Sequence, residues 1–478
     1  MDRYLNYVDG AFVEGSAGWL DIENPGTGEV FASQAIGGAE DIDRAVRAAR
    51  ACHETGELYD MRPSDRGRMV RKMGDYFREH ADEIAELLTL EAGKPLWEAK
   101  VEVEGTARYF EYYGNSAETM EGRSIPLGKG YFDFTIYEPV GVSAQIIPWN
   151  YPIEMTGRSL SAALATGNAC VIKSPELDPL THKYFALAAE AVGLPKGAVN
   201  IVCGHGAEAG VALSSHPGIN QVVFTGSVET GVRVATAAAQ NVVPCVLELG
   251  GKSAGIVYPD ADLDSLVDNI RWGIIFGAGQ VCSAMSRLIV HADVYDEVVE
   301  RAAALAKSIS VGPGIERPEF GPNMGAMVSE GQRDQALALV QRAQAEGARV
   351  AAGGHKLNIP GHYLEPTIFA DVTPDMEIAQ TEVFGPVLSV LKASNEDQAL
   401  EIANGTDYGL VGGVFTRDLD RAMTVAGKMR AGQVFVNEWY AGGVETPFGG
   451  YGKSGYGREK GREALWNYVQ TKNIAIAR

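Results

Sequence analysis

The sequence predicts an α/β fold with parallel sheets, and three observations support this class. Short apolar runs alternate with helical patterns between residues 140 and 250, and the same alternation returns between 250 and 440. Strands that alternate with helices form parallel sheets covered by helices on both faces, and such sheets bind ligands beyond the carboxyl ends of their strands. The 57 glycines among 478 residues indicate many tight turns and close contacts between backbone and ligand.

The first half of the chain combines a helical region with the first sheet. Apolar residues recur at helical spacing within 39–120, and apolar and polar residues alternate as in a strand from 131 onward. The apolar runs that follow predict strands at 142–147, 169–173, 199–203, 221–225 and 243–247, with helices near 156–166, 180–192, 207–214 and 229–240.

A second α/β unit follows without a long linker or an internal repeat. It predicts strands at 288–291, 387–391, 411–415 and 433–436, and helices near 294–308, 330–346, 394–404 and 418–429. The end of the chain, 471–478, alternates isoleucine with alanine and predicts a final strand. An exposed edge strand there needs a partner, and another subunit is one candidate.

Composition and charge exclude several classes of function. The net charge of −21 disfavours binding to nucleic acid, and no apolar run reaches membrane-spanning length. The start of the chain has no signal-peptide pattern, and the five cysteines are scattered without a CxxC pair. We therefore expect a cytoplasmic protein with reduced thiols, no metal and a small-molecule substrate, without nucleic-acid or membrane partners.

Two residues carry the candidate chemistry. Cys282 lies in the glycine-rich stretch FGAGQVCS, where a backbone N–H can hold an oxyanion. Glu248 ends an apolar strand in LELGGK, where a carboxylate must be solvated, paired or functional. Each alone has an ordinary explanation, as a small buried hydrophobe and as a strand-end residue. Together with a nucleotide-type fold they predict aldehyde oxidation, because a thiolate attacks a carbonyl carbon and a carboxylate activates water against the thioester.

Loops after the predicted strands add polar groups suited to an oxyanion and a nucleotide. In PWNYP, proline fixes the loop and the Asn150 amide can donate to an oxyanion, although a rigid turn explains it equally well. FTGSVETG offers N–H groups for a pyrophosphate, yet it lacks the GxGxxG pattern, and Ser227 also suits a helix cap. Glu176, three residues after Lys173, can accept ribose hydroxyls and repel a 2′-phosphate, which favours NAD over NADP. A solvated pair of loop residues is the ordinary alternative for Lys173 and Glu176.

The chain carries, in this order, the motifs PWN, LELGGK, GQVCS, EVFGP and PFGGYGKSG. With them it resembles the aldehyde dehydrogenase superfamily over essentially its whole length. The resemblance implies a Rossmann-type cofactor domain (1–119 and 141–249), an α/β catalytic domain (250–447) and small β oligomerisation segments (120–140 and 448–478). It also implies a homodimer or a homotetramer.

The resemblance further implies roles for individual residues. Cys282 would be the nucleophile, Glu248 the general base, and Asn150 with the Cys282 N–H the oxyanion hole. Lys173 and Glu176 match adenine-ribose positions, although the usual KPxE reads KSPE here. NAD, with NADP as the alternative, would contact Ile146, Pro148, Trp149, Lys173, Glu176, Gly206, Gly210, Gly226, Ser227, Thr230, Gly231, Leu249, Glu382 and Phe384. Branches of the family that transfer the acyl group to coenzyme A typically lack the Glu248 carboxylate, so hydrolysis is expected.

Arg158 is the residue that bears on which aldehyde is used. It matches an arginine with which semialdehyde dehydrogenases of the family hold an anionic tail, and a guanidinium suits a carboxylate. An ion pair with Glu154 is an equally weighted alternative. A second arginine of succinic semialdehyde dehydrogenases is Phe276 here. We therefore expect another small anionic semialdehyde, with a neutral aliphatic or aromatic aldehyde as the alternative.

Two other classes of protein fit some of the same residues. A cysteine-dependent esterase would use Cys282 and Glu248 without a cofactor. A crystallin-like structural protein on the same fold would have lost the cysteine or the cofactor contacts, and both are present.

Overall fold

An eight-stranded sheet organises the first α/β unit, in a computed structural model that describes residues 2–478. Its order is β22–β12–β11–β8–β9–β10–β2–β3. The parallel strands are β8 (Val142–Ile146), β9 (Ala169–Ser174), β10 (Val199–Cys203), β11 (Gln221–Gly226) and β12 (Cys245–Leu249). Strand order reverses between β8 and β11, so a switch point of the kind that binds dinucleotides lies there. Antiparallel edges are β2 (Asn6–Val8), β3 (Ala11–Val13) and β22 (Gly455–Tyr456).

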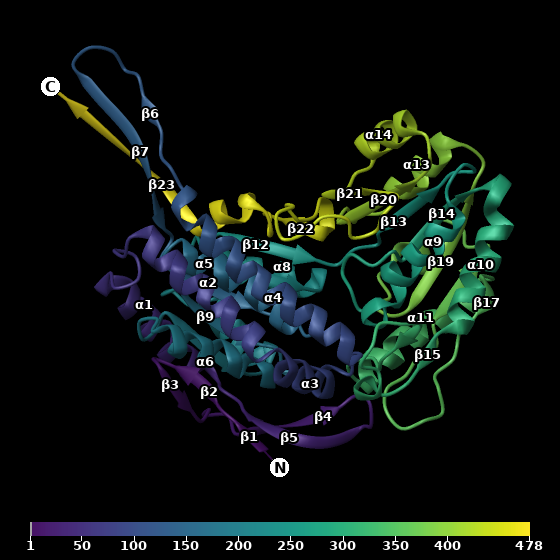
Figure 1. Cartoon of the computed structure of the whole chain (residues 1–478), viewed down its shortest axis with the longest axis horizontal. Coiled ribbons are helices and arrows are strands. Elements are labelled where there is room, and N and C mark those ends of the chain that lie inside the picture. The colour runs from purple at the N-terminus through teal and green to yellow at the C-terminus, as the bar shows by residue number, and fades with distance from the viewer. Residues whose placement is uncertain (1) are drawn as a thin grey trace.

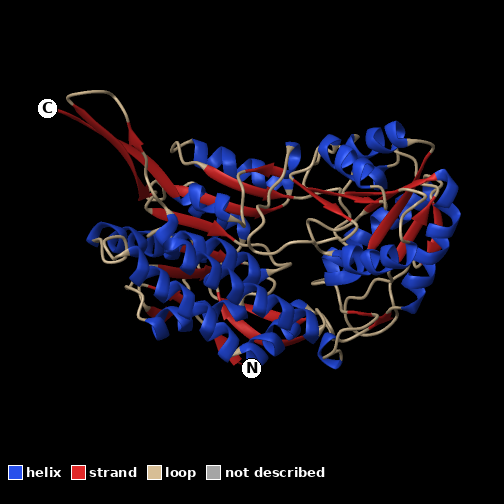
Figure 2. Ribbon diagram, turned by 45° about the horizontal axis from the view of Figure 1, so that its top comes forward, coloured by secondary structure: helices blue, strands red, loops and turns tan. Residues whose placement is uncertain are grey.

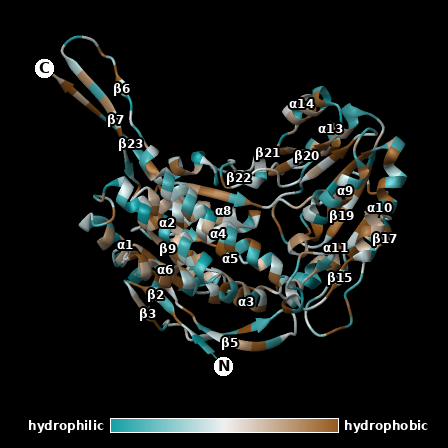
Figure 3. Ribbon diagram, in the orientation of Figure 1, coloured by the Kyte–Doolittle hydropathy of each residue, from teal (hydrophilic) through white to brown (hydrophobic). Residues whose placement is uncertain are grey.

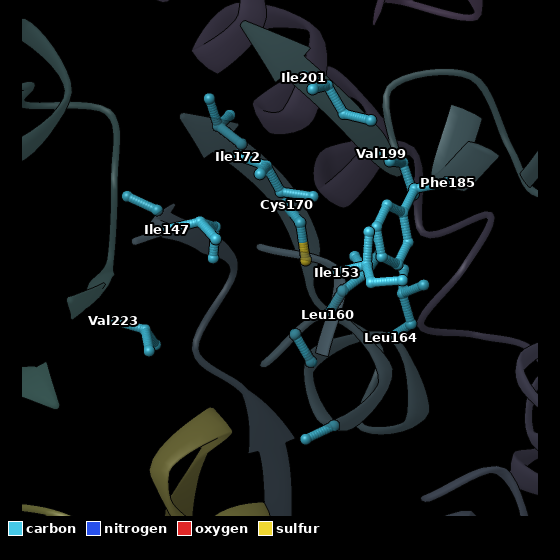
Figure 4. Packing of buried hydrophobic residues seen from close by; sticks show 14 of the residues in the cluster. Ile147, Ile153, Leu160, Leu164, Cys170, Ile172, Phe185, Val199, Ile201 and Val223 are labelled. Atoms are coloured by element: carbon cyan, nitrogen blue, oxygen red, sulfur yellow. The ribbon is translucent and has the colours of Figure 1, made fainter. Parts of the chain in front are cut away.

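Helices cover this sheet and bury its apolar side chains (Figure 1). They are α1 (Ala39–Thr55), α2 (Pro63–Glu79), α3 (Ala81–Ala92), α4 (Leu96–Ser116), α5 (Pro152–Ala165), α6 (Lys183–Val192), α7 (Val211–Ser214) and α8 (Val228–Ala239). In the core, Leu160 and Leu164 of α5 and Phe185 of α6 lie beside Cys170 of β9 (Figure 4). These side chains are fully buried, which fixes α5 against the sheet whose strand ends form the candidate site.

A seven-stranded sheet with its own core organises the second unit. Its order is β17 (Arg349–Ala352), β18 (Thr367–Ala370), β19 (Val387–Ala393), β14 (Arg287–His291), β13 (Ala254–Val257), β20 (Val411–Phe415) and β21 (Gln433–Val436). Its helices are α9 (Leu263–Ile270), α10 (Tyr295–Ser308), α11 (Glu330–Ala345), α12 (Glu377–Gln380), α13 (Glu396–Asn404) and α14 (Leu419–Lys428). Hydrophobic residues follow the strands of both sheets, and hydrophilic residues lie mainly on surface helices and loops (Figure 3).

Smaller sheets complete the structure. One joins β1 (Asp2–Tyr4), β5 (Glu29–Ala35) and β4 (Trp19–Asn24), and another joins β15 (Ser310–Val311) and β16 (Asn323–Met324). A third forms an arm that projects from the body, from β6 (Ser124–Ile125), β7 (Tyr131–Pro139) and β23 (Val469–Ala477) (Figures 1 and 2). Among residues 2–478, no helix combines the length and apolar character needed to cross a bilayer.

Most expected elements are present, and the differences have local causes. The strands expected at 199–203, 411–415 and 433–436 coincide with β10, β20 and β21. β12 begins two residues later than expected, because Val242 has a positive φ of 58° and the chain still turns there. The final strand exists as β23, but it pairs with β7 of the same chain. Residues 455–456, expected within an oligomerisation segment, instead extend the first sheet as β22.

Candidate active site

A cavity of about 620 Å³ lies between α4, α5 and the loops of the second unit. Asn150, Arg158 and Cys282 all line it, so the structure brings together three residues that are far apart in the sequence. Its remaining wall is rich in aromatic rings, among them Tyr109, Tyr151, Trp272, Phe276, Tyr440 and Phe448. The cavity is therefore large enough, and apolar enough, to enclose a small organic substrate.

The loop before Cys282 has an unusual backbone. Gly277, Ala278 and Gly279 have successive positive φ angles of 62°, 52° and 67°. A Cβ at Gly279 would lie 2.2 Å from the carbonyl oxygen of Gly385, so only glycine fits there. The tight turn delivers Cys282 to the cavity, where the residue stays partly exposed.

Asn150 lies directly against this loop. It follows β8 and Pro148, and α5 begins two residues later with Pro152 at its first position, where proline is favoured. The Asn150 Nδ2 donates to the carbonyl oxygen of Gln280 at 2.9 Å, two residues before Cys282. The side-chain amide and the thiol thus face the same small region of the cavity.

Glu248 lies near the end of β12 and is almost completely enclosed, with 2% of its surface exposed. Neither carboxylate oxygen has a hydrogen-bond partner within residues 2–478. Burial, and next the charge of Glu459, raise the pKa of Glu248 well above its usual range, while Arg158 acts in the opposite direction. A carboxyl group with a raised pKa and unused lone pairs is suited to accept a proton near neutral pH.

The thiol of Cys282 responds to the same charges. Burial raises its pKa to about 12, the charge of Glu248 adds to this effect, and Arg158 opposes it. The reactivity of the thiol therefore depends on the balance of charges around it.

Arg158 is neutralised within the chain. Its guanidinium forms an ion pair with Glu459, and each side chain is at most 4% exposed. It also lies 5.6 Å from the ring centre of Phe448. The alternative of a structural ion pair is confirmed, but the partner is Glu459 and not Glu154, because β22 and the loop after it bring Glu459 to Arg158. A guanidinium that already has a carboxylate partner attracts an anionic tail only weakly, which disfavours the substrate role expected for Arg158.

The polar groups expected for a nucleotide lie around the switch point. Ser227 caps α8, its Oγ accepting from the Thr230 N–H at 3.2 Å, and the helix start follows β11. A Cβ at Gly231 would lie 2.5 Å from the side chain of Leu249, so this glycine lets α8 pack closely on β12. A Cβ at Gly210, just before α7, would meet no atom within 4 Å among the described residues, so there is open space beside this glycine. Ile146, Pro148, Gly226 and Leu249 lie at or just beyond the carboxyl ends of β8, β11 and β12.

Lys173 and Glu176 form an ion pair beside this space. The Gly206 N–H donates to Glu176 Oε1 at 3.2 Å. Although burial opposes ionisation, Lys173 and the Gly206 N–H lower the pKa of Glu176. A carboxylate that is ionised and oriented in this way can accept hydrogen bonds from ribose hydroxyls.

Glu382 and Phe384 join the EVFGP motif to LELGGK and PWN. Glu382 Oε1 accepts from the Gly251 N–H at 3.0 Å, and a Cβ at Gly250 would lie 2.0 Å from Glu382 Oε2. Gly250 is thus required by the close approach of Glu382, whereas a Cβ at Gly251 would lie 2.6 Å from the carbonyl oxygen of Cys282. The ring of Phe384 packs edge-on against Trp149, with centroids 5.2 Å apart. Burial raises the pKa of Glu382 to about 7.

A buried cluster of charged residues next to the site was not predicted from the sequence. Lys94, Glu98 and Glu102 contact the backbone of the Asn150 segment or of the loop before Cys282. Glu98 and Glu102 lie on one face of α4, and Lys94 precedes the helix at the same spacing of four residues, which was a usable signal. Glu459 was missed because its partner Arg158 lies far away in the sequence.

The fold and the site define an α/β enzyme in which a cysteine stands beside a dinucleotide-type sheet. The sequence matches the aldehyde dehydrogenase family over residues 12–474. It is 42% identical over 457 residues to the mitochondrial aldehyde dehydrogenase of Mesocricetus auratus, covering 95% of this chain and 91% of that protein. It is 40% identical over 473 residues to the mitochondrial benzaldehyde dehydrogenase of Antirrhinum majus, covering 98% and 88%.

A solved structure gives the same result. The NAD+ complex of an aldehyde dehydrogenase from Bacillus cereus has a TM-score of 0.97 to this chain at 38% identity, covering 99% of this chain and 96% of that one. The chain belongs to the aldehyde dehydrogenase family.

Proposed function

We propose that this enzyme oxidises a neutral aromatic or bulky apolar aldehyde to the carboxylic acid, with Cys282 as nucleophile, Glu248 as general base and NAD as electron acceptor. The observation that carries the reaction is the convergence of Cys282 and Asn150 on one cavity, with Glu248 close enough to raise the pKa of the thiol. The aromatic wall of the same cavity supports the proposed class of substrate.

The residues around the switch point fit NAD. The start of α8 offers backbone N–H groups to a pyrophosphate, and the Glu176 carboxylate suits the adenine ribose. A 2′-phosphate beside Glu176 would be repelled, which favours NAD over NADP. Glu382 is held by Gly251 where it can accept from the second ribose, next to Phe384 and Trp149. When bound, the nicotinamide supplies a two-electron acceptor for the carbon attacked by Cys282.

The protein's own groups then account for the remaining steps. The Cys282 thiolate adds to the aldehyde carbon and forms a thiohemiacetal, whose oxyanion is held by the Asn150 amide and the Cys282 N–H. Oxidation leaves a thioester on the sulfur. Glu248 takes a proton from water while the water oxygen attacks the thioester carbon. The bond between this carbon and the sulfur then breaks, which releases the carboxylic acid and the Cys282 thiolate.

The aromatic wall distinguishes the substrates that the sequence left open. Rings of Tyr151, Trp272, Phe276 and Phe448 favour a flat or bulky apolar group by stacking and by burial of apolar surface. The small anionic semialdehyde remains the competing hypothesis, but Arg158 is already paired with Glu459. A neutral substrate requires no change in that ion pair.

A substrate panel tests the proposal. Purified protein with NAD is mixed with benzaldehyde, a linear aliphatic aldehyde and a small semialdehyde, and reduced cofactor is followed by absorbance. We expect the highest kcat/KM for benzaldehyde and no activity in the Cys282→Ala variant. Ester cleavage without cofactor as the main activity would instead support the esterase class, and no turnover of any aldehyde would support a structural protein. A preference for the semialdehyde that disappears in Arg158→Met would restore the anionic-tail hypothesis.

We further infer that the arm joins a second subunit. It projects from the body and exposes large apolar side chains, among them Tyr131, Phe132 and Ile476. β23 is an edge strand with one side unpaired in the described chain. Such edges are covered in stable proteins, and a homodimer or homotetramer would cover this one. Light scattering of the full chain, compared with a Phe132→Asp variant, tests this assembly.

A further inference from the structure

A cluster of charged residues at and just before the start of α4 contacts the two segments that carry the donors of the proposed oxyanion hole. Lys94, Glu98 and Glu102 are 6%, 2% and 1% exposed, and none of them lines the substrate cavity. Lys94 forms an ion pair with Glu102. Buried charges of this kind are costly unless each is paired or hydrogen-bonded, so the contacts they make are informative.

Lys94 and Glu102 hold the segment that carries Asn150. Lys94 Nζ donates to the carbonyl oxygen of Asn150 at 3.0 Å. Glu102 Oε1 accepts from the N–H groups of Ile153 and Glu154, at 3.1 and 3.2 Å, in the first turn of α5. A carboxylate at a helix N-terminus pairs with N–H groups that have no partner inside the helix. The position of Asn150 is thus fixed on both sides of the residue.

Glu98 holds the loop that carries Cys282. Its Oε2 accepts from the Gly277 N–H at 3.1 Å, and Glu98 itself is 2% exposed. Gly277 is the first of the residues with positive φ before Cys282, where the loop takes its sharp turn. Without this acceptor, a partly buried N–H group in a turn with successive positive φ angles would lose its protein partner, and the turn would relax.

Hydrogen bonds connect the two halves into one circuit. Asn150 Nδ2 donates to the Gln280 carbonyl at 2.9 Å, and Gln280 Nε2 donates to the Gly277 carbonyl at 3.2 Å. Gly277 in turn donates to Glu98, four residues along the chain from Lys94, which contacts Asn150. The distance between the Asn150 amide and the Cys282 backbone therefore depends on α4.

We infer that Glu98 is a positioning residue that fixes the loop of Cys282 relative to Asn150 by accepting the Gly277 N–H. This rests on the proposed roles of Cys282 and Asn150. An oxyanion hole stabilises a transition state only if its donors are held in place before the reaction. Small displacements of such groups reduce rates by about 10²-fold.

Variants of Glu98 that differ in length and charge test this role. In Glu98→Gln an amide oxygen of the same length still accepts from Gly277, so kcat should stay within about threefold of the wild type. In Glu98→Asp the carboxyl group remains but the acceptor oxygen is withdrawn, and in Glu98→Ala the acceptor is absent. Both should lose kcat by about 10²-fold, with unchanged KM for NAD and an unchanged thermal shift on addition of NAD.

Asp41→Ala is a matched control. Asp41 is 4% exposed and accepts from the Ser16 and Gly38 N–H groups, at 2.9 and 3.1 Å. Neither of these groups belongs to the hydrogen-bond circuit that includes the Cys282 loop. Loss of Asp41 should lower stability without lowering kcat selectively. This control separates a general loss of buried hydrogen bonds from a loss of position.

The outcomes divide clearly. Wild-type kcat in a folded Glu98→Asp or Glu98→Ala protein would overturn the inference. So would a Glu98→Gln variant that loses as much kcat as Glu98→Asp, because an acceptor of unchanged length would then not preserve the rate. If Glu98→Ala does not fold, the comparison of Gln with Asp still decides. Failure of the proposed function itself would appear elsewhere, as aldehyde turnover retained in Cys282→Ala.

Discussion

The buried pair of Arg158 and Glu459 should control the pH at which Glu248 works, with opposite signs for the two partners. Arg158 lowers the pKa of Glu248 and Glu459 raises it. In Arg158→Met the pKa of Glu248 should rise, and the ascending limb of kcat/KM against pH should move to higher pH. In Glu459→Gln it should move to lower pH. A single charge at close range moves such a limb by about 1–3 pH units.

The same variants have a predictable effect on stability. Each side chain of the pair is at most 4% exposed, so either single variant leaves an uncompensated buried group. Removing one partner of a buried ion pair costs about 3–5 kcal/mol, whereas replacing both partners is often nearly neutral. The variant with both replacements should therefore unfold closer to the wild type than either single variant, and its pH limb should lie between theirs.

The assay is initial-rate kinetics at saturating NAD over a pH series, with urea unfolding of the same preparations. Arg66→Met is a suitable control, because Arg66 is 5% exposed and donates to the carbonyl oxygens of Ala165 and Tyr59 without a carboxylate partner. Arg66→Met should lower the free energy of unfolding and leave the ascending limb of kcat/KM against pH unchanged. Limbs that move in the same direction in Arg158→Met and Glu459→Gln, or do not move, would refute this electrostatic account.

Two further outcomes follow from individual pKa values. Because the pKa of the Cys282 thiol is about 12, raised by burial and then by Glu248, alkylation by iodoacetamide should accelerate about tenfold per pH unit above neutrality. It should be faster in Glu248→Gln, as peptide mass spectrometry would show, and an equal rate would contradict the role of Glu248. Burial raises the pKa of Glu98 from 4.5 to about 8, so its contribution to stability is present below about pH 4.5 and is lost as pH rises through about 8. In Glu98→Gln this part of the pH dependence of urea unfolding should disappear; an unchanged dependence would show that Glu98 ionises normally.

Much of the sheet architecture was predictable because the parallel strands are buried on both faces. β10 and β20 are continuous apolar runs whose limits appear directly in the sequence. The amino-terminal strands were missed, since β1 and β3 are short and largely exposed and carry no alternation. β13 was also missed, because its four residues follow the double glycine of LELGGK without a turn signal of their own.

The candidate site was predictable where function resides in short motifs, and not where it depends on partners distant in the sequence. Cys282 and Asn150 each lie in a motif whose local chemistry indicated an oxyanion site, and both line one cavity. Nothing near Arg158 in the sequence indicates Glu459, because the contact forms only once β22 has paired with β12. Helical spacing suggested Glu154 instead, whereas the Arg158 guanidinium pairs with Glu459.

The distribution of buried charge connects α4 and α5, and not only the cofactor sheet, to the candidate site. One set, around Lys94, contacts the Asn150 segment and the Cys282 loop; the other, around Arg158, acts on Glu248. Apolar packing of these helices would by itself be at least as stable, because buried ion pairs rarely add net stability. The sheet determines where a dinucleotide can lie, whereas the two charged sets determine where the thiol lies and how readily the carboxylate accepts a proton. On the proposed roles of Cys282 and Glu248, the chemistry therefore depends on packing between α4 and α5 as well as on the sheet that would hold the nucleotide.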